Sequence, residues 1–277
     1  MKIFITGGTG FIGRNLIDFY CDEEIFQYKR GSDLADDLKY FKPDLIINSA
    51  AEIYKSELMW EPNVLMVLEC LNYVRSNPNT KMIQIGSSAE YGPMPRASNE
   101  QDRINPVDIY QATKGAATLL CQGYARNYGL NIKIARPYSV YGKFERPHRL
   151  FPRLWRAFRL DQGMKLYQGY HDFIYINDFV RGIDYIVRND STPAGDIINF
   201  GSGVQYSNFE VLELWEKIFG YSAQVDVITT MAKSYESEVW VCDTSYARQK
   251  YDFEIKYDLE QGIKDFIEVA DYHEENV

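Results

Sequence analysis

A tyrosine and a lysine stand four residues apart in the stretch NPVDIYQATKGAAT, where Tyr110 precedes Lys114 and a run of small side chains follows. On a helix, residues i and i+4 share a face, so the two side chains are expected to lie side by side. A neighbouring ammonium group favours the phenolate and lowers a tyrosine pKa. The pair therefore predicts a general acid/base that works near neutral pH. By itself, the same spacing is more common on a helix surface that does no chemistry.

Two serines lie just upstream, in IGSSAEYG at the end of a predicted strand. Ser87 and Ser88 fall where the carboxyl ends of parallel strands meet the ligand crevice of an open α/β sheet. A hydroxyl group there is able to hold a substrate alcohol or carbonyl beside the phenol of Tyr110. The order and spacing of these groups favour chemistry over a chance surface pair.

The chain begins with a glycine-rich turn, TGGTGFIG, between a short apolar strand and a segment with helical spacing. It fits both a GxGxxG pattern and a GxxGxxG pattern. Glycines let the backbone turn tightly and approach a pyrophosphate, which rests on the amino terminus of the following helix. The alternative is a tight strand-to-helix turn without a ligand. The predicted dinucleotide contacts are Gly7, Thr9, Gly10, Phe11, Ile12 and Gly13.

The second predicted strand ends in QYKRGSD, which bears on the choice of dinucleotide. An acidic residue at this place would bind the ribose 2′-hydroxyl of NAD. Lys29 and Arg30 stand there instead, and two cations attract a 2′-phosphate. The sequence thus favours NADP(H), with NAD(H) possible if both cations are simply solvated. Asp33 follows three residues later and is expected to serve the adenine.

These groups need a parallel sheet to bring them together. Apolar strands are predicted at 2–8, 24–29, 44–51, 81–88 and 131–142, and helices between them include 62–76 and 108–128. Strands that alternate with helices imply a parallel sheet with right-handed crossovers. The predicted fold is therefore α/β, a Rossmann-type doubly wound sheet with a smaller mixed α/β substrate-binding lobe. The dinucleotide-binding domain is expected at 1–142, with about 173–202 returning to it, and the lobe at 143–277.

The composition excludes several classes of protein. A net charge of −9 argues against binding to nucleic acid or to an anionic membrane. The longest apolar runs are strand-sized, far short of the roughly 20 residues of a membrane span, and the first residues read as a strand and not a signal sequence. The 4 cysteines and 3 histidines are scattered, which disfavours a structural zinc site. We expect a cytoplasmic, reduced, metal-free protein.

Together these motifs resemble the extended short-chain dehydrogenase/reductases that act on nucleotide sugars, namely NAD(P)-dependent epimerases, dehydratases and 4-keto reductases. The resemblance covers nearly the whole chain and includes TGGTGFIG, PDLIINSAA, GSSAEYG, YQATK, ARPYSVYG and HDFIYINDF. It implies that Tyr110 is the acid/base, that Lys114 holds the nicotinamide ribose, and that Ser88 takes the family's Ser/Thr place. The further cofactor contacts that it implies are Asp33 and Leu34 at the adenine, Ala50 and Ala51 after the third strand, and Pro137 and Tyr138 at the nicotinamide.

The substrate side departs from the family pattern. His171 stands where members often carry an arginine that contacts the substrate diphosphate, Ser139 replaces a frequent asparagine, and the stretch 231–240 lacks a second arginine. We expect the diphosphate to be held by Arg146, Arg149, Arg153 or Arg156, unless these form a solvated basic loop. The losses also leave room for a substrate without the usual nucleotide. The predicted substrate contacts are Ser87, Glu90, Ser139, Arg153 and His171.

The resemblance leaves three reactions open. The basic pair at 29–30 and the short amino-terminal half favour a 4-keto-sugar reductase, whereas ARPYSVYG and HDFIYINDF look as much like an epimerase. A 4,6-dehydratase ranks third, because Ala89 offers no partner to Glu90, and a structural glutamate before YG is favoured over a dehydratase base. A non-catalytic NADP(H)-binding sensor or scaffold is the alternative from another class, and the presence of both Tyr110 and Lys114 speaks against it. The family also implies a homodimer through the helix at 108–128.

Overall fold

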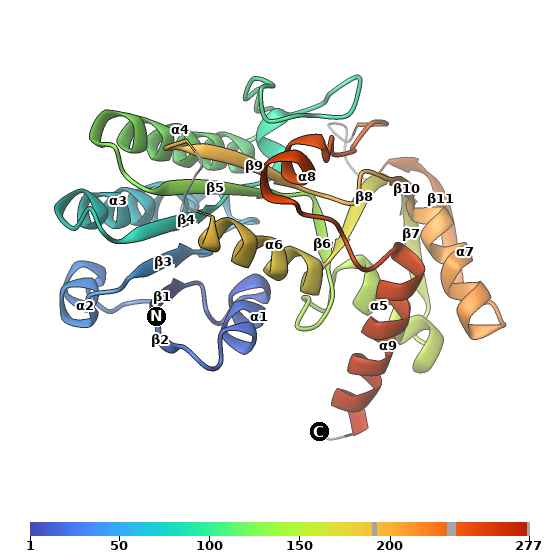
Figure 1. Cartoon of the computed structure of the whole chain (residues 1–277). Helices are drawn as coiled ribbons and strands as arrows, with labels where there is room; N and C mark the ends of the chain where they lie inside the picture. The colour runs from blue at the N-terminus through green and yellow to red at the C-terminus, as the bar shows by residue number, and fades with distance from the viewer. Residues whose placement is uncertain (190–192, 232–236, 276–277) are drawn as a thin grey trace.

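The computed structural model describes residues 1–189, 193–231 and 237–275 of the 277-residue chain. At its centre is a six-stranded sheet of order β2-β1-β3-β4-β5-β9, in which every neighbouring pair is parallel (Figure 1). The strands are β1 (Lys2–Thr6), β2 (Glu24–Gln27), β3 (Leu45–Asn48), β4 (Lys81–Ile85), β5 (Ile132–Pro137) and β9 (Asp196–Phe200). The predicted Rossmann-type α/β fold is thus confirmed.

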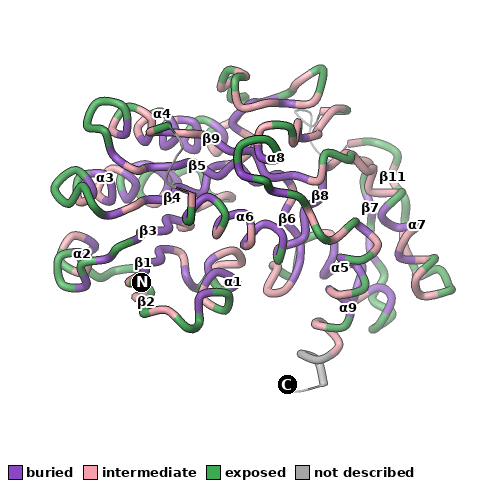
Figure 2. The backbone as a smooth tube through the Cα atoms, in the orientation of Figure 1, coloured by how far each residue is buried: buried purple, intermediate pink, exposed green. Residues whose placement is uncertain are grey.

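Helices cover both faces of this sheet. In β1, Ile3 and Ile5 join the apolar cluster that includes residues of α1 (Phe11–Phe19) and α6 (Ile176–Arg188). Phe4 points the other way, because alternate residues of a strand face opposite sides. It joins the cluster built by α2 (Leu34–Phe41), α3 (Met66–Ser76) and α4 (Ile109–Tyr128). Strands buried on both faces explain the near-continuous apolar runs in the sequence, and Figure 2 shows β3 and β5 buried along their length, whereas the edge strand β2 is partly exposed.

A smaller part of the structure lies beyond the ends of β4 and β5 (Figure 1). It contains a three-stranded sheet of order β10-β8-β6 and a two-stranded sheet of β11 and β7. Its strands are β6 (Ser139–Tyr141), β7 (Met164–Gln168), β8 (Tyr170–Tyr175), β10 (Gln205–Ser207) and β11 (Val225–Met231). Its helices are α5 (Leu150–Arg159), α7 (Asn208–Phe219) and α9 (Leu259–Glu275). The helix α8 (Ser245–Tyr251) packs against β9 of the central sheet, and short helical turns η1 (Ser56–Leu58), η2 (Glu61–Leu65) and η3 (Ser88–Tyr91) occur earlier in the chain.

The stretch 131–142, predicted as one strand, forms two strands in different sheets. β5 ends at Pro137, opposite Phe200 of β9. The Tyr138 N–H then donates to the Phe200 carbonyl at 2.8 Å, after which the chain leaves the sheet as β6 and pairs with β8. The single-strand prediction was wrong because apolar periodicity alone does not reveal that the partner strand changes. The switch places Pro137 and Tyr138 at the junction of the two parts.

Several properties of the described ranges bear on function. No helix there combines the length and the apolar character needed to cross a bilayer. All four cysteines are free thiols, with Cys21 exposed and the others buried. Within the same ranges, no group of three or more histidine, cysteine or acidic side chains is arranged to hold a metal ion.

Candidate active site

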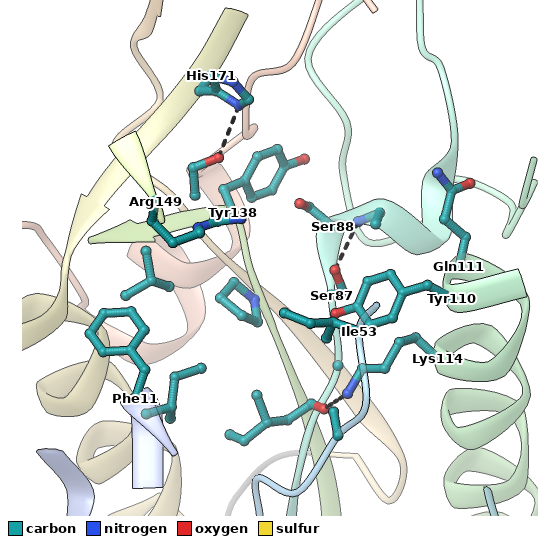
Figure 3. A pocket seen from close by; sticks show the side chains of 18 of the residues that line it. Phe11, Ile53, Ser87, Ser88, Tyr110, Gln111, Lys114, Tyr138, Arg149 and His171 are labelled. Carbon is teal, nitrogen blue, oxygen red and sulfur yellow. Dashed lines mark hydrogen bonds between the residues drawn. The ribbon is translucent and has the colours of Figure 1, made fainter. Parts of the chain in front are cut away.

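A cleft of about 460 Å³ lies where the carboxyl ends of the sheet strands meet the smaller part. Its walls come from the glycine turn before α1, the end of β4, the first turns of α4, and the loops around β6 and β8. Side chains from both parts point into it (Figure 3). This is where ligands bind in open α/β sheets.

The glycine turn lines the cleft, and Gly7 and Gly13 leave no room for a Cβ atom. A Cβ atom on Gly13 would lie 2.2 Å from the Gly7 carbonyl oxygen, and one on Gly7, whose φ is +68°, would lie 2.7 Å from the Ala50 nitrogen. Gly10 caps α1 without a side chain, and the first bond within the helix is Arg14 N–H to the Gly10 carbonyl at 3.0 Å. The N–H groups of the intervening first turn therefore lack acceptors within the helix. A helix amino terminus with free N–H groups and a glycine cap fits the pyrophosphate of a dinucleotide.

Tyr110 lies in the first turn of α4 and lines the cleft. Asp108 caps this helix by accepting from the Gln111 N–H at 2.8 Å, which fixes its start. The Tyr110 hydroxyl points toward Ser87 at the end of β4 (Figure 3). Burial raises the pKa of Tyr110 to about 12, and a hydrogen bond with Ser87 acts in the opposite direction. The phenol is therefore protonated at neutral pH and pairs with a serine hydroxyl.

Lys114 lies one turn further along α4 and lines the same cleft. Its ammonium group is buried and donates to the Ile85 carbonyl oxygen at the end of β4. Burial lowers the pKa of Lys114 to about 8. The main influences on the pKa of Tyr110 do not include Lys114. The prediction that Lys114 lowers this pKa is thus wrong for the structure, because desolvation of the phenol prevails.

The serine that faces Tyr110 is Ser87, and not Ser88 as the resemblance implied. Ser87 is the last extended residue before the short helix η3, with φ of −160°. Its hydroxyl accepts from the Ala89 N–H at 3.2 Å, and its own N–H donates to Glu90 Oε1 at 2.8 Å. Ser88 also lines the cleft, but it is already the first residue of η3. Since both serines line the cleft, the family role that the resemblance gives to Ser88 stays a prediction.

A role of the Ser87 hydroxyl in orienting the reacting oxygen predicts that Ser87→Ala lowers kcat about 10- to 100-fold. Ser88→Ala, the matched control, should retain more than a third of the activity. Steady-state kinetics on both variants measures the difference. A larger loss in Ser88→Ala would return the catalytic role to Ser88.

Glu90 is fully buried and does not line the cleft, so its prediction as a substrate contact was wrong. One carboxylate oxygen accepts from Arg136 Nε at 2.9 Å and from the Thr118 hydroxyl at 2.7 Å. Arg136 is itself buried, in β5. The carboxylate therefore joins η3, β5 and α4 beneath the catalytic groups, as a structural glutamate does.

The predicted adenosine contacts lie outside the cleft. Lys29 and Arg30 are exposed just after β2, and neither forms an ion pair with another described residue. Asp33 caps α2 by accepting from the Asp36 N–H at 2.9 Å, and Leu34 is buried in the core. Thr9 is exposed in the glycine turn, and of the two alanines after β3 only Ala51 lines the cleft. These placements leave the adenosine assignments as predictions.

The substrate end contains part of the predicted set. His171 and Ser139 both line the cleft, with Ser139 Oγ 3.3 Å from His171 Nδ1. Burial lowers the pKa of His171 to about 4, so this ring is neutral at pH 7. Pro137 and Tyr138 line the cleft as well.

The arginines of the 146–156 stretch divide into two groups. Arg146 and Arg149 line the cleft. Arg153 was predicted to bind substrate, but it does not line the cleft and donates to the Lys165 carbonyl at 2.7 Å. Arg156 binds the Pro147 carbonyl. The helical spacing of α5, beginning at Leu150, turns the later arginines away, and only the residues before the helix reach the cleft.

Sequence reasoning missed several residues that line the cleft. Glu145 lies in the stretch KFERPHR, which reads as a basic and aromatic loop, so its lone carboxylate drew no notice. Trp240 and Ser237 reach the cleft from the carboxyl-terminal part, where no motif marks them. Of the stretch 231–240 that lacks the expected arginine, residues 232–236 lie outside the described residues.

Comparison with known proteins agrees with this geometry. The family model "NAD dependent epimerase/dehydratase family" matches residues 3–201. The low-salt glycan biosynthesis protein Agl12 of Haloferax volcanii is 25% identical over 84% of this chain and 87% of its own. Two solved structures share the fold. The dTDP-glucose 4,6-dehydratase of Bacillus anthracis in complex with NAD has a TM-score of 0.89 and 21% identity, and the match covers 99% of this chain and 98% of that one. The UDP-glucuronic acid 4-epimerase of Bacillus cereus in complex with UDP-glucuronic acid and NAD has a TM-score of 0.88 and 23% identity, and the match covers 99% of this chain and 100% of that one. The chain belongs to the NAD-dependent epimerase/dehydratase family.

Proposed function

We propose that this enzyme moves a hydride between a nicotinamide dinucleotide and a carbon of a nucleotide sugar, at C4, and acts as an epimerase. The observation that carries the proposal is that Tyr110, Ser87 and Lys114 line one cleft together with the glycine turn. The similar structures from Bacillus hold NAD, and one of them also holds a nucleotide sugar. These two structures, one of a dehydratase and one of an epimerase, support NAD as the working cofactor.

Each catalytic side chain has a role that its surroundings explain. The dinucleotide supplies the hydride acceptor and donor when it is bound. Tyr110 exchanges one proton with the sugar: as the phenolate it would accept the proton of the sugar alcohol during oxidation, and as the phenol it would return that proton to the keto oxygen during reduction. Ser87 orients the same sugar oxygen by a hydrogen bond, and Lys114, fixed on the Ile85 carbonyl, is placed to hold a ribose hydroxyl.

Dehydration is less well supported than epimerisation. A 4,6-dehydratase needs an acid and a base beside the catalytic hydroxyl to remove water. Ala89 lines the cleft at that place, and the Glu90 carboxylate is bound to Arg136 outside it. The short segment after β4 therefore lacks a carboxylate that faces the substrate.

The experiment that tests the function offers NAD or NADPH with a panel of UDP- and dTDP-linked hexoses and follows products by NMR. The expected result is the C4 epimer, formed with NAD and with no net consumption of reduced nicotinamide. Tight dinucleotide binding without conversion of any nucleotide sugar would contradict the proposal and support the sensor alternative.

A 4-keto-sugar reductase that uses NADP(H) is the second candidate, favoured by the exposed, unpaired Lys29 and Arg30 just after β2. We expect Lys29→Ala/Arg30→Ala to weaken NADP binding about tenfold or more and to change NAD binding less than twofold, since each cation lost removes a charge-assisted hydrogen bond. Titration calorimetry measures both affinities. Lys39→Ala, an exposed lysine of α2, is the control. Equal effects on the two dinucleotides would remove the case for NADP.

We also propose a homodimer through α4. The small residues Thr113, Gly115 and Ala117 pack inside the chain, so they do not form the contact surface. Ile109, Leu119 and Tyr128, large apolar side chains on this helix, are exposed. Light scattering at micromolar concentration should give twice the chain mass, and Leu119→Glu should shift it toward the monomer; a monomeric wild type would contradict the proposal.

A further inference from the structure

Glu145 presents an unusual carboxyl group at the cleft. Its side chain is only 4% exposed, and Oε1 lies 3.5 Å from Arg149 Nε. Oε2 is buried and has no hydrogen-bond partner among the protein groups that the structure describes. A buried polar atom without a partner carries the full cost of its desolvation. An atom of this kind at a ligand cleft is explained if a ligand supplies the missing partner.

The turn that holds Glu145 is fastened from outside the cleft. The Glu145 N–H donates to the Gly142 carbonyl at 3.0 Å, and Phe144 between them has a left-handed φ of 68°. A bulky residue keeps this conformation where its surroundings impose it. The Arg14 guanidinium lies 3.8 Å from the Phe144 ring centroid, and Asn15 Nδ2 donates to the Lys143 carbonyl at 2.8 Å. Contacts to α1 therefore contribute to the position of the turn, in addition to the interactions of the Glu145 carboxylate with the Gly142 backbone and with Arg149.

The charge state of Glu145 limits the chemical groups that are able to form a hydrogen bond with its Oε2. Burial raises the pKa of its carboxyl group to about 8, although Arg149 acts in the opposite direction. A protonated carboxyl group donates one hydrogen bond and accepts others. A hydroxyl group also does both, so it satisfies Oε2 whether or not Glu145 is ionised. A phosphate or a carboxylate brings no donor and would satisfy only the protonated form.

Glu145 also stands near the reacting groups. Arg149 lines the same cleft as Glu145, His171 and Tyr110, and its charge influences the pKa of all three. In Figure 3, Arg149 points into the same space as the Tyr110 side chain. A sugar that meets Tyr110 with one hydroxyl group therefore shares a single cleft with the pair Glu145–Arg149.

We propose that Glu145 determines substrate specificity by binding, through Oε2, one hydroxyl group of the sugar other than the hydroxyl that meets Tyr110. The inference rests on the proposed function and deepens it, since it assigns a sugar-binding role to a residue outside the catalytic groups. A buried water bound to Oε2 is the competing explanation, and it predicts no sensitivity to individual sugar hydroxyls.

The experiment combines Glu145→Ala and Glu145→Gln with ligands that lack single hydroxyls. UDP-glucose and its 2-deoxy, 3-deoxy and 6-deoxy forms, or the dTDP series if only that binds, are titrated calorimetrically with the NAD-loaded protein. We expect the wild type to bind one deoxy form about tenfold more weakly than the parent, as the loss of one hydrogen bond predicts. In Glu145→Ala this one penalty should vanish while the others stay. Glu100→Gln is the control, because Glu100 is a largely buried carboxyl group outside the cleft that accepts from the Asn199 N–H at 2.9 Å.

The possible outcomes separate the two proposals. Deoxy penalties that are identical in the wild type and in Glu145→Ala overturn this inference and leave the proposed function standing. A wild type that binds no UDP- or dTDP-hexose overturns the proposed function and this inference with it. Thermal melting adds a second readout. A substrate-binding role predicts that Glu145→Gln, which keeps the size of the side chain, melts close to the wild type, whereas a lower melting temperature with unchanged sugar affinity indicates a structural role and contradicts the proposal.

Discussion

Tyr110→Phe is expected to lower kcat by a factor of about 10²–10⁴, the usual contribution of a positioned general acid/base. The substitution removes only the phenolic oxygen, so the ring still fills its place beside Ser87 and the cleft keeps its shape. Dinucleotide affinity should change less than threefold. Single-turnover kinetics with the preferred nucleotide sugar, together with calorimetric titration of NAD, measures the two effects separately.

Tyr124→Phe is the matched control for this experiment. Tyr124 lies on the same helix, α4, but its hydroxyl donates to Asn72 Oδ1 at 3.0 Å, away from the cleft. This variant should keep kcat within about twofold of the wild type. If Tyr110→Phe also retained full turnover, Tyr110 would not be the acid/base, and the reaction would need another proton carrier in the cleft.

Gly13→Ala should abolish dinucleotide binding and lower the melting temperature. The new methyl group would lie 2.2 Å from the Gly7 carbonyl oxygen and 2.8 Å from the Gly8 Cα. Both neighbours are backbone atoms of the phosphate turn, so the turn itself must move apart from α1. We expect dinucleotide affinity to fall by at least about 100-fold and stability by about 1–3 kcal/mol, the range for overpacking. Calorimetric titration and thermal melting measure the two losses.

Gly123→Ala provides the opposite case with the same chemical change. Gly123 is an exposed residue within α4, and a Cβ there meets no atom within 4 Å. Alanine in a helix interior is favoured over glycine by about 0.5–1 kcal/mol, so this variant should be as stable as the wild type or more stable. Tight NAD binding by Gly13→Ala would show that the glycine turn is not the pyrophosphate site.

Local sequence signals predicted the scaffold of the site well. The spacing of Gly7, Gly10 and Gly13 is dictated by close backbone approach, which only glycine permits, so the motif carries its own structural reason. The run at 108–128 predicted a helix that appears as α4, because Asp108 caps its start and Gly129 ends it in a left-handed conformation. Signals of this kind depend on neighbours in the chain, and the sequence therefore contains them.

Relations between distant segments were harder to predict. Whether Ser87 or Ser88 faces Tyr110 depends on where η3 begins relative to α4. A shift of that start by one residue would exchange the two serines. The charge on Lys114 was expected to act on the phenol, but it is bound to the Ile85 carbonyl, and burial governs the pKa of Tyr110. Glu90 looked like a substrate group because its partner, Arg136, comes 46 residues later. In each case the deciding contact joins elements that the sequence does not bring together.

The Glu90 carboxylate has a further consequence for how this site evolves. Through it, the backbone of Ser87 is tied to the Arg136 side chain of β5 and to the Thr118 hydroxyl of α4. The distance between the Ser87 and Tyr110 hydroxyl groups thus depends on the ion pair Glu90–Arg136, which lies outside the cleft. A homologue that lost Arg136 would keep every residue of the catalytic motifs but would hold the two hydroxyl groups at a different distance. Its motifs alone would then predict an activity that the protein lacks.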